Sequence, residues 1–174
     1  MRLKSSRVAS FARNTSGNTT TEFVLLIPII LSLIVFTVEG SVQLFTRAVL
    51  QYGLREATRF GSTGAAFPPN MAANPPASRE AAIPLIIAEY GLGLINSSYL
   101  SVSLTSYSAF SAVGAAGQGS AGAGGPGAVV QYQVVYFQRW MFPGSAYPAA
   151  TATGWSGIQH TLTMVVQNEA FPAN

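Results

Sequence analysis

The sequence predicts an α+β protein: a long N-terminal helix, membrane-spanning in its first half, followed by a small head built on an antiparallel β-sheet. Residues 23–38 form a run of 16 residues that is almost entirely apolar. A helical apolar pattern continues to about Phe60, and three later segments have the composition of strands. Only 9% of the chain is charged, against about a quarter of a usual soluble domain, so much apolar surface is expected to meet lipid or a partner.

Basic residues are concentrated before residue 17. Four of the nine, at positions 2, 4, 7 and 13, lie there, and no acidic residue precedes Glu22. If this leader were removed, five basic and six acidic residues would remain, a formal charge of −1. The basic character therefore belongs to the leader and gives no reason to expect a nucleic-acid partner. The chain has no cysteine, which excludes thiol catalysis, disulfides and thiolate metal sites.

The apolar run is long enough for one membrane span. As a helix, residues 23–38 extend about 24 Å, and continuation to Phe45 gives about 34 Å. A bilayer core of about 30 Å needs about 20 residues, so we predict a transmembrane segment at about residues 23–45. The run is longer than the apolar region of a secretory signal peptide, and no Ala-x-Ala site follows it. Because the leader cations precede the span, we expect a cytoplasmic N-terminus and an exported remainder.

Two glutamates mark the ends of this run. An acid near the bilayer centre costs about 2.5–3.5 kcal/mol, so each one needs an explanation. Glu22 opens the helix, where the helix dipole favours an anion by about 0.3–1 kcal/mol and a preceding threonine can cap the first turn. That position suits either a plain helix-start acid or an acid with a specific function.

Glu39 lies directly after the run. Ser32, Gln43 and Thr46 fall within about 60° of it on a helix that turns about 100° per residue. Such an intramembrane polar face can recognise another helix. The alternative is that Glu39 extends to the outer interface beside Arg47, and the sequence leaves both open.

Gly17, Glu22 and Phe23 stand in a specific register: a glycine, four residues, a glutamate and an aromatic residue before the apolar run. This stretch, SGNTTTEF, resembles the processing site of type IV-type prepilins. Residues 19–61 are similar to the TadE-like pseudopilins of tight-adherence (Flp) pili.

Other features carry the same resemblance. Pro28 lies early in the span, Glu39 lies near its outer end, and Arg-Glu-Ala-Thr-Arg closes the segment at residues 55–59. The terminal VVQNEAF is similar to the family's Asn-Glu-Pro-aromatic ending, with Ala170 in place of the proline.

The resemblance implies a pilin-like fold and a processing event. Cleavage would fall between Gly17 and Asn18, and Glu22 would become the fifth residue of the mature chain. In pilin-like proteins that acid is thought to pair with the N-terminal amine of a neighbouring subunit. Such a pair aligns only at the correct axial stagger, so it would fix register more than it adds stability.

The resemblance also implies a function, a location and partners. The function is that of a minor pilin (pseudopilin) in the biogenesis of a tight-adherence pilus. The location is the bacterial inner membrane, single-pass, with a periplasmic head that can enter an extracellular pilus. The partners are the prepilin peptidase, other pseudopilins, the major pilin and the inner-membrane assembly platform.

The domain organisation follows from these signals. Residues 1–17 are the leader, 18–60 the long helix, 61–77 a Pro-rich linker and 78–174 the exported head. Ser78 is placed to cap a short helix over residues 79–90. Strands are expected at residues 99–107, 129–138 and 158–167, in a three-stranded antiparallel sheet. The Gly-rich segment 114–127 is expected to be a flexible connection, because no Lys-Ser/Thr follows it as in a phosphate-binding loop.

No catalytic constellation is present in the sequence, and we predict neither an enzyme nor a cofactor nor a metal site. The chain has no aspartate and a single histidine, His160, and its glutamates are scattered. His160 shares one strand face with Ile158, Leu162 and Met164, which favours a structural core or edge position.

The loop at residues 137–148 is rich in aromatic residues. Trp140, Met141 and Phe142 are candidates for partner contact if exposed, or they fold back over an open sheet edge. An alternative function rests on this loop: a permanently membrane-anchored periplasmic module that binds a ligand through its aromatic side chains.

Overall fold

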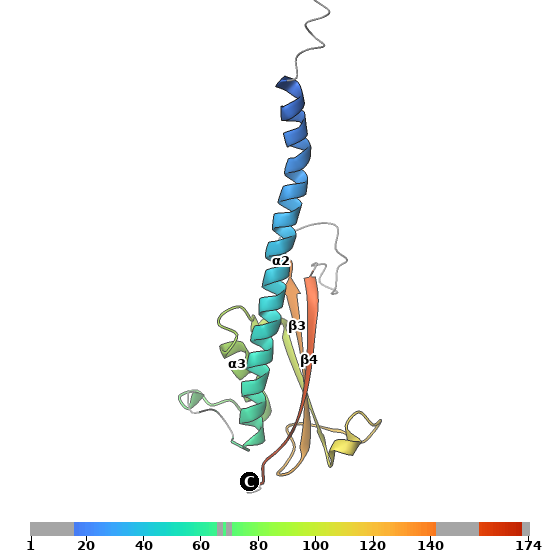
Figure 1. Cartoon of the computed structure of the whole chain (residues 1–174). Coiled ribbons are helices and arrows are strands. Elements are labelled where there is room, and N and C mark those ends of the chain that lie inside the picture. Colours follow the sequence, from blue (N-terminus) through green and yellow to red (C-terminus); the bar gives the residue numbers. More distant parts are fainter. Residues whose placement is uncertain (1–15, 66–67, 69–70, 142–156, 172–174) are drawn as a thin grey trace, which may run out of the picture. The chain divides into compact units, whose positions relative to one another are not determined.

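The computed structural model describes residues 16–65, 68, 71–141 and 157–171 (Figure 1). By its contacts the chain divides into two compact units, residues 1–41 and 42–174. Helix α2 (Ser16–Ser62), of 47 residues, contributes to both. It ends two residues beyond the predicted Phe60, within the usual variation of helix ends.

The described part of the first unit is helical and strongly apolar. Leu25, Leu33 and Phe36 have exposed fractions of 67%, 65% and 72%, and the other large apolar side chains from Phe23 to Val38 are mostly exposed as well. Helix α2 is the one helix of the described residues that is long and apolar enough to cross a membrane. Lipid or a protein partner is needed to cover a surface of this kind.

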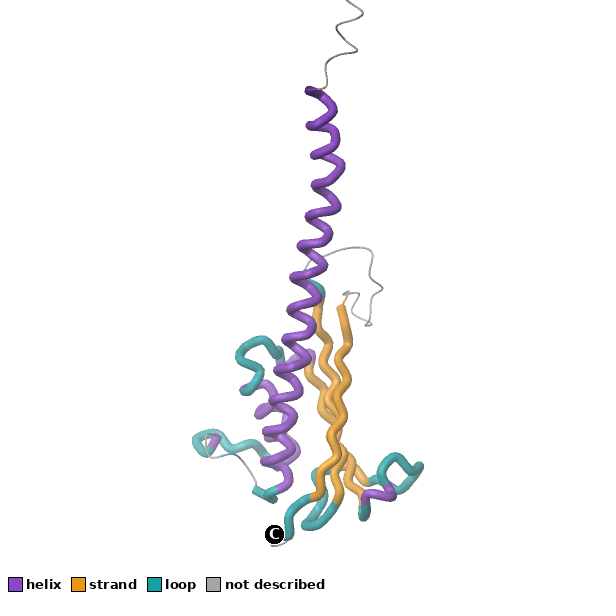
Figure 2. The backbone as a smooth tube through the Cα atoms, viewed as in Figure 1, coloured by secondary structure: helices purple, strands orange, loops and turns teal. Residues whose placement is uncertain are grey.

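The second unit combines two α-helical segments with one antiparallel sheet (Figure 2). The helical segments are the part of α2 after residue 41 and helix α3 (Arg79–Glu89). The sheet has the order β2-β1-β3-β4. Its strands, and the two short 3-10 helices beside β1, are β1 (Leu100–Tyr107), β2 (Ser120–Ala121), β3 (Val129–Arg139), β4 (Gly157–Gln167), η2 (Ser97–Tyr99) and η3 (Phe110–Ala112). The predicted α+β class is confirmed, and each expected strand is found within one residue of its predicted bounds.

The core lies between one face of the sheet and the two helices α2 and α3. The register pairs Val134 of β3 with Leu162 of β4 and with Val102 of β1, so these side chains share the face that carries the core. Helix α2 contributes Leu50 and other residues of the stripe predicted from the sequence. The fully buried or nearly buried members of that stripe are Leu50, Leu54 and Ala57. A one-sided stripe of this kind is what a helix needs to pack on a sheet.

Helix α3 begins where the sequence predicts. Ser78 lies before it in extended conformation, and its hydroxyl accepts a hydrogen bond from the Ala81 amide at 3.2 Å. This contact satisfies one of the unpaired amides of the first turn. Ile83 and Ile87 on the next turns are fully buried, which fixes the face that α3 turns to the core.

The expectation of three strands was wrong by one. Strand β2 lies inside the Gly-rich segment and pairs with β1 through Thr105↔Ala121 and Ser106↔Ser120. The segment was expected to be flexible, but three side chains far away in the sequence hold its backbone. These contacts are Arg79 Nη2 to the carbonyls of Ala123 (2.9 Å) and Gly124, Asn168 Nδ2 to the carbonyls of Ala123 and Gly125 (2.9 Å each), and the Ala123 amide to Glu80 Oε1 (3.1 Å).

Tyr132 packs against the end of α2 in a space that only glycine leaves open. Its side chain is fully buried, and a Cβ added at Gly61 would lie 2.1 Å from the Tyr132 hydroxyl oxygen. Within the described part of the chain that hydroxyl has no hydrogen-bond partner. Burial raises the pKa of Tyr132, which therefore stays neutral at physiological pH.

We expect Gly61→Ala to lower the free energy of unfolding of the second unit by about 1–3 kcal/mol, because a methyl group overfills this space. Tyr132→Phe should be close to neutral, since it removes an unsatisfied buried hydroxyl. The double variant should recover part of the loss, because the clashing oxygen is gone. Denaturant unfolding of the full chain in uncharged detergent micelles measures all three.

Gly125→Ala is the matched control, because an added Cβ there meets no atom within 4 Å. If the Gly61 and Tyr132 effects were simply additive, the proposed contact between the two would be refuted.

Candidate functional site

The predicted processing and assembly residues lie near the start of helix α2. Gly17 and Asn18 belong to its first turn, and Glu22 and Phe23 follow about one turn later. Both of these side chains are exposed, Phe23 with a fraction of 61%. The structure thus presents Glu22 on the surface that a second helix or a lipid headgroup would meet.

Hydroxyl side chains inside the apolar segment bond to their own helix. Ser32 Oγ donates to the Pro28 carbonyl at 2.6 Å, and Thr37 Oγ1 donates to the Leu33 carbonyl at 2.8 Å. A hydroxyl satisfied in this way costs little in lipid, where water is not at hand. Ser32 therefore has a local hydrogen bond, and its role in an intramembrane polar face stays a prediction.

Glu39 differs from its apolar neighbours. Its exposed fraction is 7%, whereas the exposed fraction of Phe36 is 72% and that of Leu44 is 73%. The acid is thus kept away from the exposed apolar surface of the helix. Whether it recognises a partner helix or extends to the interface stays a prediction.

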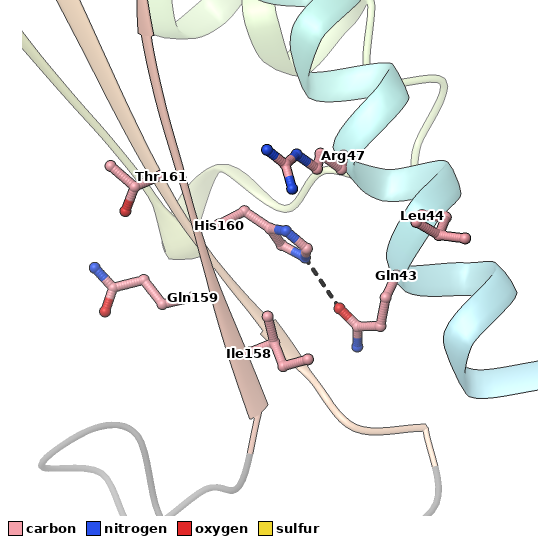
Figure 3. Close-up of a pocket in the computed structure, with 7 residues that line it drawn as sticks. All are labelled: Gln43, Leu44, Arg47, Ile158, Gln159, His160 and Thr161. Carbon is pink, nitrogen blue, oxygen red and sulfur yellow. Dashed lines mark hydrogen bonds between the residues drawn. The ribbon is translucent and has the colours of Figure 1, made fainter. Parts of the chain in front are cut away.

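Gln43 and Thr46 lie in the second unit and are buried there, with exposed fractions of 8% and 3%. Gln43 Oε1 lies 3.0 Å from His160 Nε2 (Figure 3). Gln138 Oε1 of β3 lies 3.2 Å from the same nitrogen. Since amide oxygens only accept, Nε2 carries the hydrogen. These amides hold the sole histidine of the chain in one orientation and in one tautomer.

Around this contact lies a pocket of about 380 Å³ between helix α2 and strand β4. Figure 3 shows Ile158 and His160 pointing toward the helix, while Gln159 and Thr161 point to the other side of the strand. The residues that line the pocket are Gln43, Leu44, Arg47, Ile158, Gln159, His160 and Thr161. We call this the Arg47–His160 pocket.

The electrostatics of the pocket are cationic. Burial lowers the pKa of His160, and the nearby Arg47 guanidinium lowers it further. No acidic residue lines the pocket. At neutral pH the pocket therefore combines one permanent cation with a neutral imidazole.

Comparison with known proteins locates a family within the chain. The family model of TadE-like proteins matches residues 17–59. The helical segment of this chain is TadE-like. The predicted resemblance is thereby confirmed over that segment, and it is consistent with a pilus protein. Neither the curated proteins nor the solved structures gave a match.

The TadE-like segment includes α2 almost completely, but the pocket needs residues beyond it. Arg47 lies inside the matched segment and His160 lies 113 positions later along the printed sequence. The sequence predicts Arg47 only as a neighbour of Glu39, and it favours a structural role for His160 on a strand over a metal-binding or catalytic one. The alternation of side chains along the strand predicted that His160 lies on the inner face of the sheet. It did not predict which turn of helix α2 packs against His160.

The candidate contact residues of the aromatic loop are described only in part. Trp140 is half-buried, and Met141 is 54% exposed. Phe142 lies outside the described residues. The role of this loop in partner contact stays a prediction.

The C-terminal segment, which lies outside the TadE-like match, closes the second unit. Asn168 is buried and ties down the Gly-rich segment, as described above. The Glu169 amide donates to the Ser62 carbonyl at 2.9 Å, where helix α2 ends. The Phe171 ring lies under the Arg79 guanidinium, 5.2 Å from Cζ to the ring centre. These contacts give the terminal Asn-Glu-Ala-Phe a structural role.

In the part of the chain that the structure describes, no cluster of side chains is arranged for metal binding or for acid–base catalysis. No group of three or more His, Cys, Asp or Glu side chains comes together there. The acidic residue nearest to such a role, Glu80, binds a backbone amide, and this hydrogen bond lowers its pKa.

The pKa of His160 predicts a pH dependence of stability. Because the folded protein holds this pKa below the ordinary value of 6.5, the unfolded chain binds the proton more readily. Stability should therefore be complete above about pH 6.5 and fall as the pH drops through that value. The midpoint of urea unfolding in uncharged micelles, measured from pH 7.5 to 5.5, tests this.

His160→Gln serves as the comparison, because an amide keeps a donor for Gln43 without titrating. Its midpoint should be flat over the same range. Parallel pH profiles for the two proteins would show that His160 is not the responsible group.

Proposed function

We propose that this chain is a minor pilin of a tight-adherence pilus, cut between Gly17 and Asn18 and assembled through its N-terminal helix. The observation that carries the proposal is the TadE-like match, which begins at Gly17 itself and leaves residues 1–16 outside. A leader that is removed before assembly makes no contacts in the assembled protein, so its sequence can differ from one family member to another. The position of the match therefore supports processing at this point.

The exposed apolar part of α2 supports the same role in two stages. Before assembly, residues 23–45 cross the inner membrane, with the basic leader in the cytoplasm and the head in the periplasm. During assembly, the same side chains exchange lipid for the helices of other subunits. Since lipid tails are as apolar as leucine, this exchange depends on packing and on polar contacts between helices.

Glu22 is the group that gives this exchange its register. After cleavage, Asn18 begins the chain with a free amine, and Glu22 lies four residues further. A glutamate and an amine from adjacent subunits relieve each other's desolvation in an apolar bundle only when the helices are correctly staggered. The exposed position of Glu22 is compatible with such a contact.

The proposed partners follow from these steps. The prepilin peptidase removes the leader, the inner-membrane platform receives the mature protein, and other pseudopilins and the major pilin surround it. The contribution of this chain is structural, and it requires no cofactor.

The mature N-terminus distinguishes this function from that of a permanent membrane anchor. We expect mass spectrometry of the protein from piliated cells to find Asn18 as the first residue. The control is Gly17→Ala, which should leave the leader attached because the peptidase site has lost its glycine. An intact leader on the unaltered protein, in cells with active peptidase, would favour the anchored binding module.

Glu22→Gln should leave membrane insertion unchanged and strongly reduce incorporation into pili, because the amide cannot supply the counter-charge. Quantitative immunoblots of membranes and of sheared pili separate the two steps. Glu56→Gln is the matched control on the same helix, since Glu56 forms a local ion pair with Arg59 of its own helix, at 3.9 Å. Normal piliation by the Glu22 variant would remove the proposed register function.

A further inference from the structure

The Arg47–His160 pocket carries positive charge without a counter-charge. Arg47 is exposed, and its guanidinium makes no hydrogen bond or ion pair with any residue that the structure describes. The other basic group, His160, is held through Nε2 by two amide oxygens, so a second proton must go to Nδ1. Arg47 therefore favours an anionic ligand at neutral pH, and His160 does so once it is protonated.

The position of Arg47 in the helix places it at the surface of a membrane. Arg47 comes 24 positions after Phe23, where the apolar run begins, which is about 36 Å along a helix. The hydrocarbon core is about 30 Å thick, and headgroups bring the bilayer to about 40–45 Å. A span that begins at Phe23 thus brings Arg47 to the headgroup layer of the leaflet next to the head.

Apolar side chains border the cation. Leu44 lines the pocket with an exposed fraction of 73%, and Phe45 beside it is 55% exposed. Ile158 of β4, half-buried, lines the same pocket. A free inorganic anion would gain nothing from contact with these apolar side chains. A phospholipid would, because its glycerol and acyl chains lie directly below its phosphate.

We propose that the Arg47–His160 pocket binds the phosphate of an anionic phospholipid headgroup. The planar guanidinium of Arg47 can donate two parallel hydrogen bonds to phosphate oxygens. A volume of about 380 Å³ accommodates a headgroup and leaves the acyl chains outside, against Leu44 and Phe45. This inference goes beyond pilus assembly and requires only that the span lies in a membrane.

Binding should be coupled to the protonation of His160. The one charged group that faces the imidazole from the pocket-lining part of α2 is Arg47, and β3 contributes the neutral amide of Gln138. A phosphate beside Arg47 offsets the repulsion between this cation and a protonated imidazole. The pKa of His160 should therefore rise when the lipid binds, and affinity should increase as the pH falls.

The single histidine gives a direct probe, because its imidazole signal in an NMR spectrum needs no assignment in an untagged chain. The full-length protein in maltoside micelles at low salt is titrated with dihexanoyl phosphatidylglycerol, dihexanoyl phosphatidylcholine or inorganic phosphate. We expect a saturable shift of the His160 signal with phosphatidylglycerol. Phosphatidylcholine and inorganic phosphate should each need at least about tenfold higher concentrations.

Arg47→Gln should weaken phosphatidylglycerol binding by about tenfold or more and abolish the rise in the His160 pKa. Arg55→Gln is the control, because it removes the same charge from an exposed position of the same helix outside the pocket. Thermal unfolding checks that both variants fold, as expected for exposed side chains.

Three results would overturn the proposal. Equal responses to both lipids would mean that the headgroup charge is not recognised. Saturation by inorganic phosphate at the same or lower concentration would assign the pocket to a free anion. A response to purified partner pilins, but to neither lipid, would assign it to a protein carboxylate.

Discussion

One helix has to satisfy two kinds of surroundings, and both units depend on how its sequence changes along its length. From Phe23 to Val38 apolar residues occupy every side, and their side chains are largely exposed, so this part needs lipid or other helices. Further along, apolar residues narrow to a stripe that includes Leu50 and Leu54, and these two are buried in the head core. A helix that remained apolar on all sides would give the head no solvated surface, whereas an amphipathic beginning would lower the affinity for the membrane.

The head is stabilised by a small number of polar contacts to backbone groups. Asn168 and Arg79 donate to carbonyls of the Gly-rich segment, which has few side chains of its own to bury. Because glycine loses much conformational entropy on folding, such a segment stays ordered only where several hydrogen bonds hold it. The contacts join Asn168 and helix α3 to the segment that follows strand β2, so parts of the chain more than 40 positions apart stabilise each other.

Local signals predicted most elements. The apolar run, the stripe after it and the Ser78 cap each involve residues close in sequence, so helices α2 and α3 could be located to within two residues. The strands followed from their β-branched and alternating composition. Strand β2 could not be predicted, because two residues among glycines carry no strand signal, and the backbone that follows them is held by side chains more than 40 positions away. The packing of Gly61 on Tyr132 was hidden for the same reason: in the sequence Gly61 shows only a low helix propensity.

The sequence by itself determined which part of the chain is suited to lipid and that no thiol chemistry is available, while cleavage after Gly17 stays a prediction from the family resemblance. These properties depend on residue type, charge and short spacings, all of which are local. Only the tertiary structure decided that Gln43 and Thr46 are buried in the head of their own chain, and that His160 and Arg47 line one pocket. Gln43 and His160 are 117 residues apart, and no periodicity reports which turn of a helix a distant strand will meet. That choice is made by core packing, in which the volumes of side chains such as Tyr132 and Leu50 set the position of the helix on the sheet.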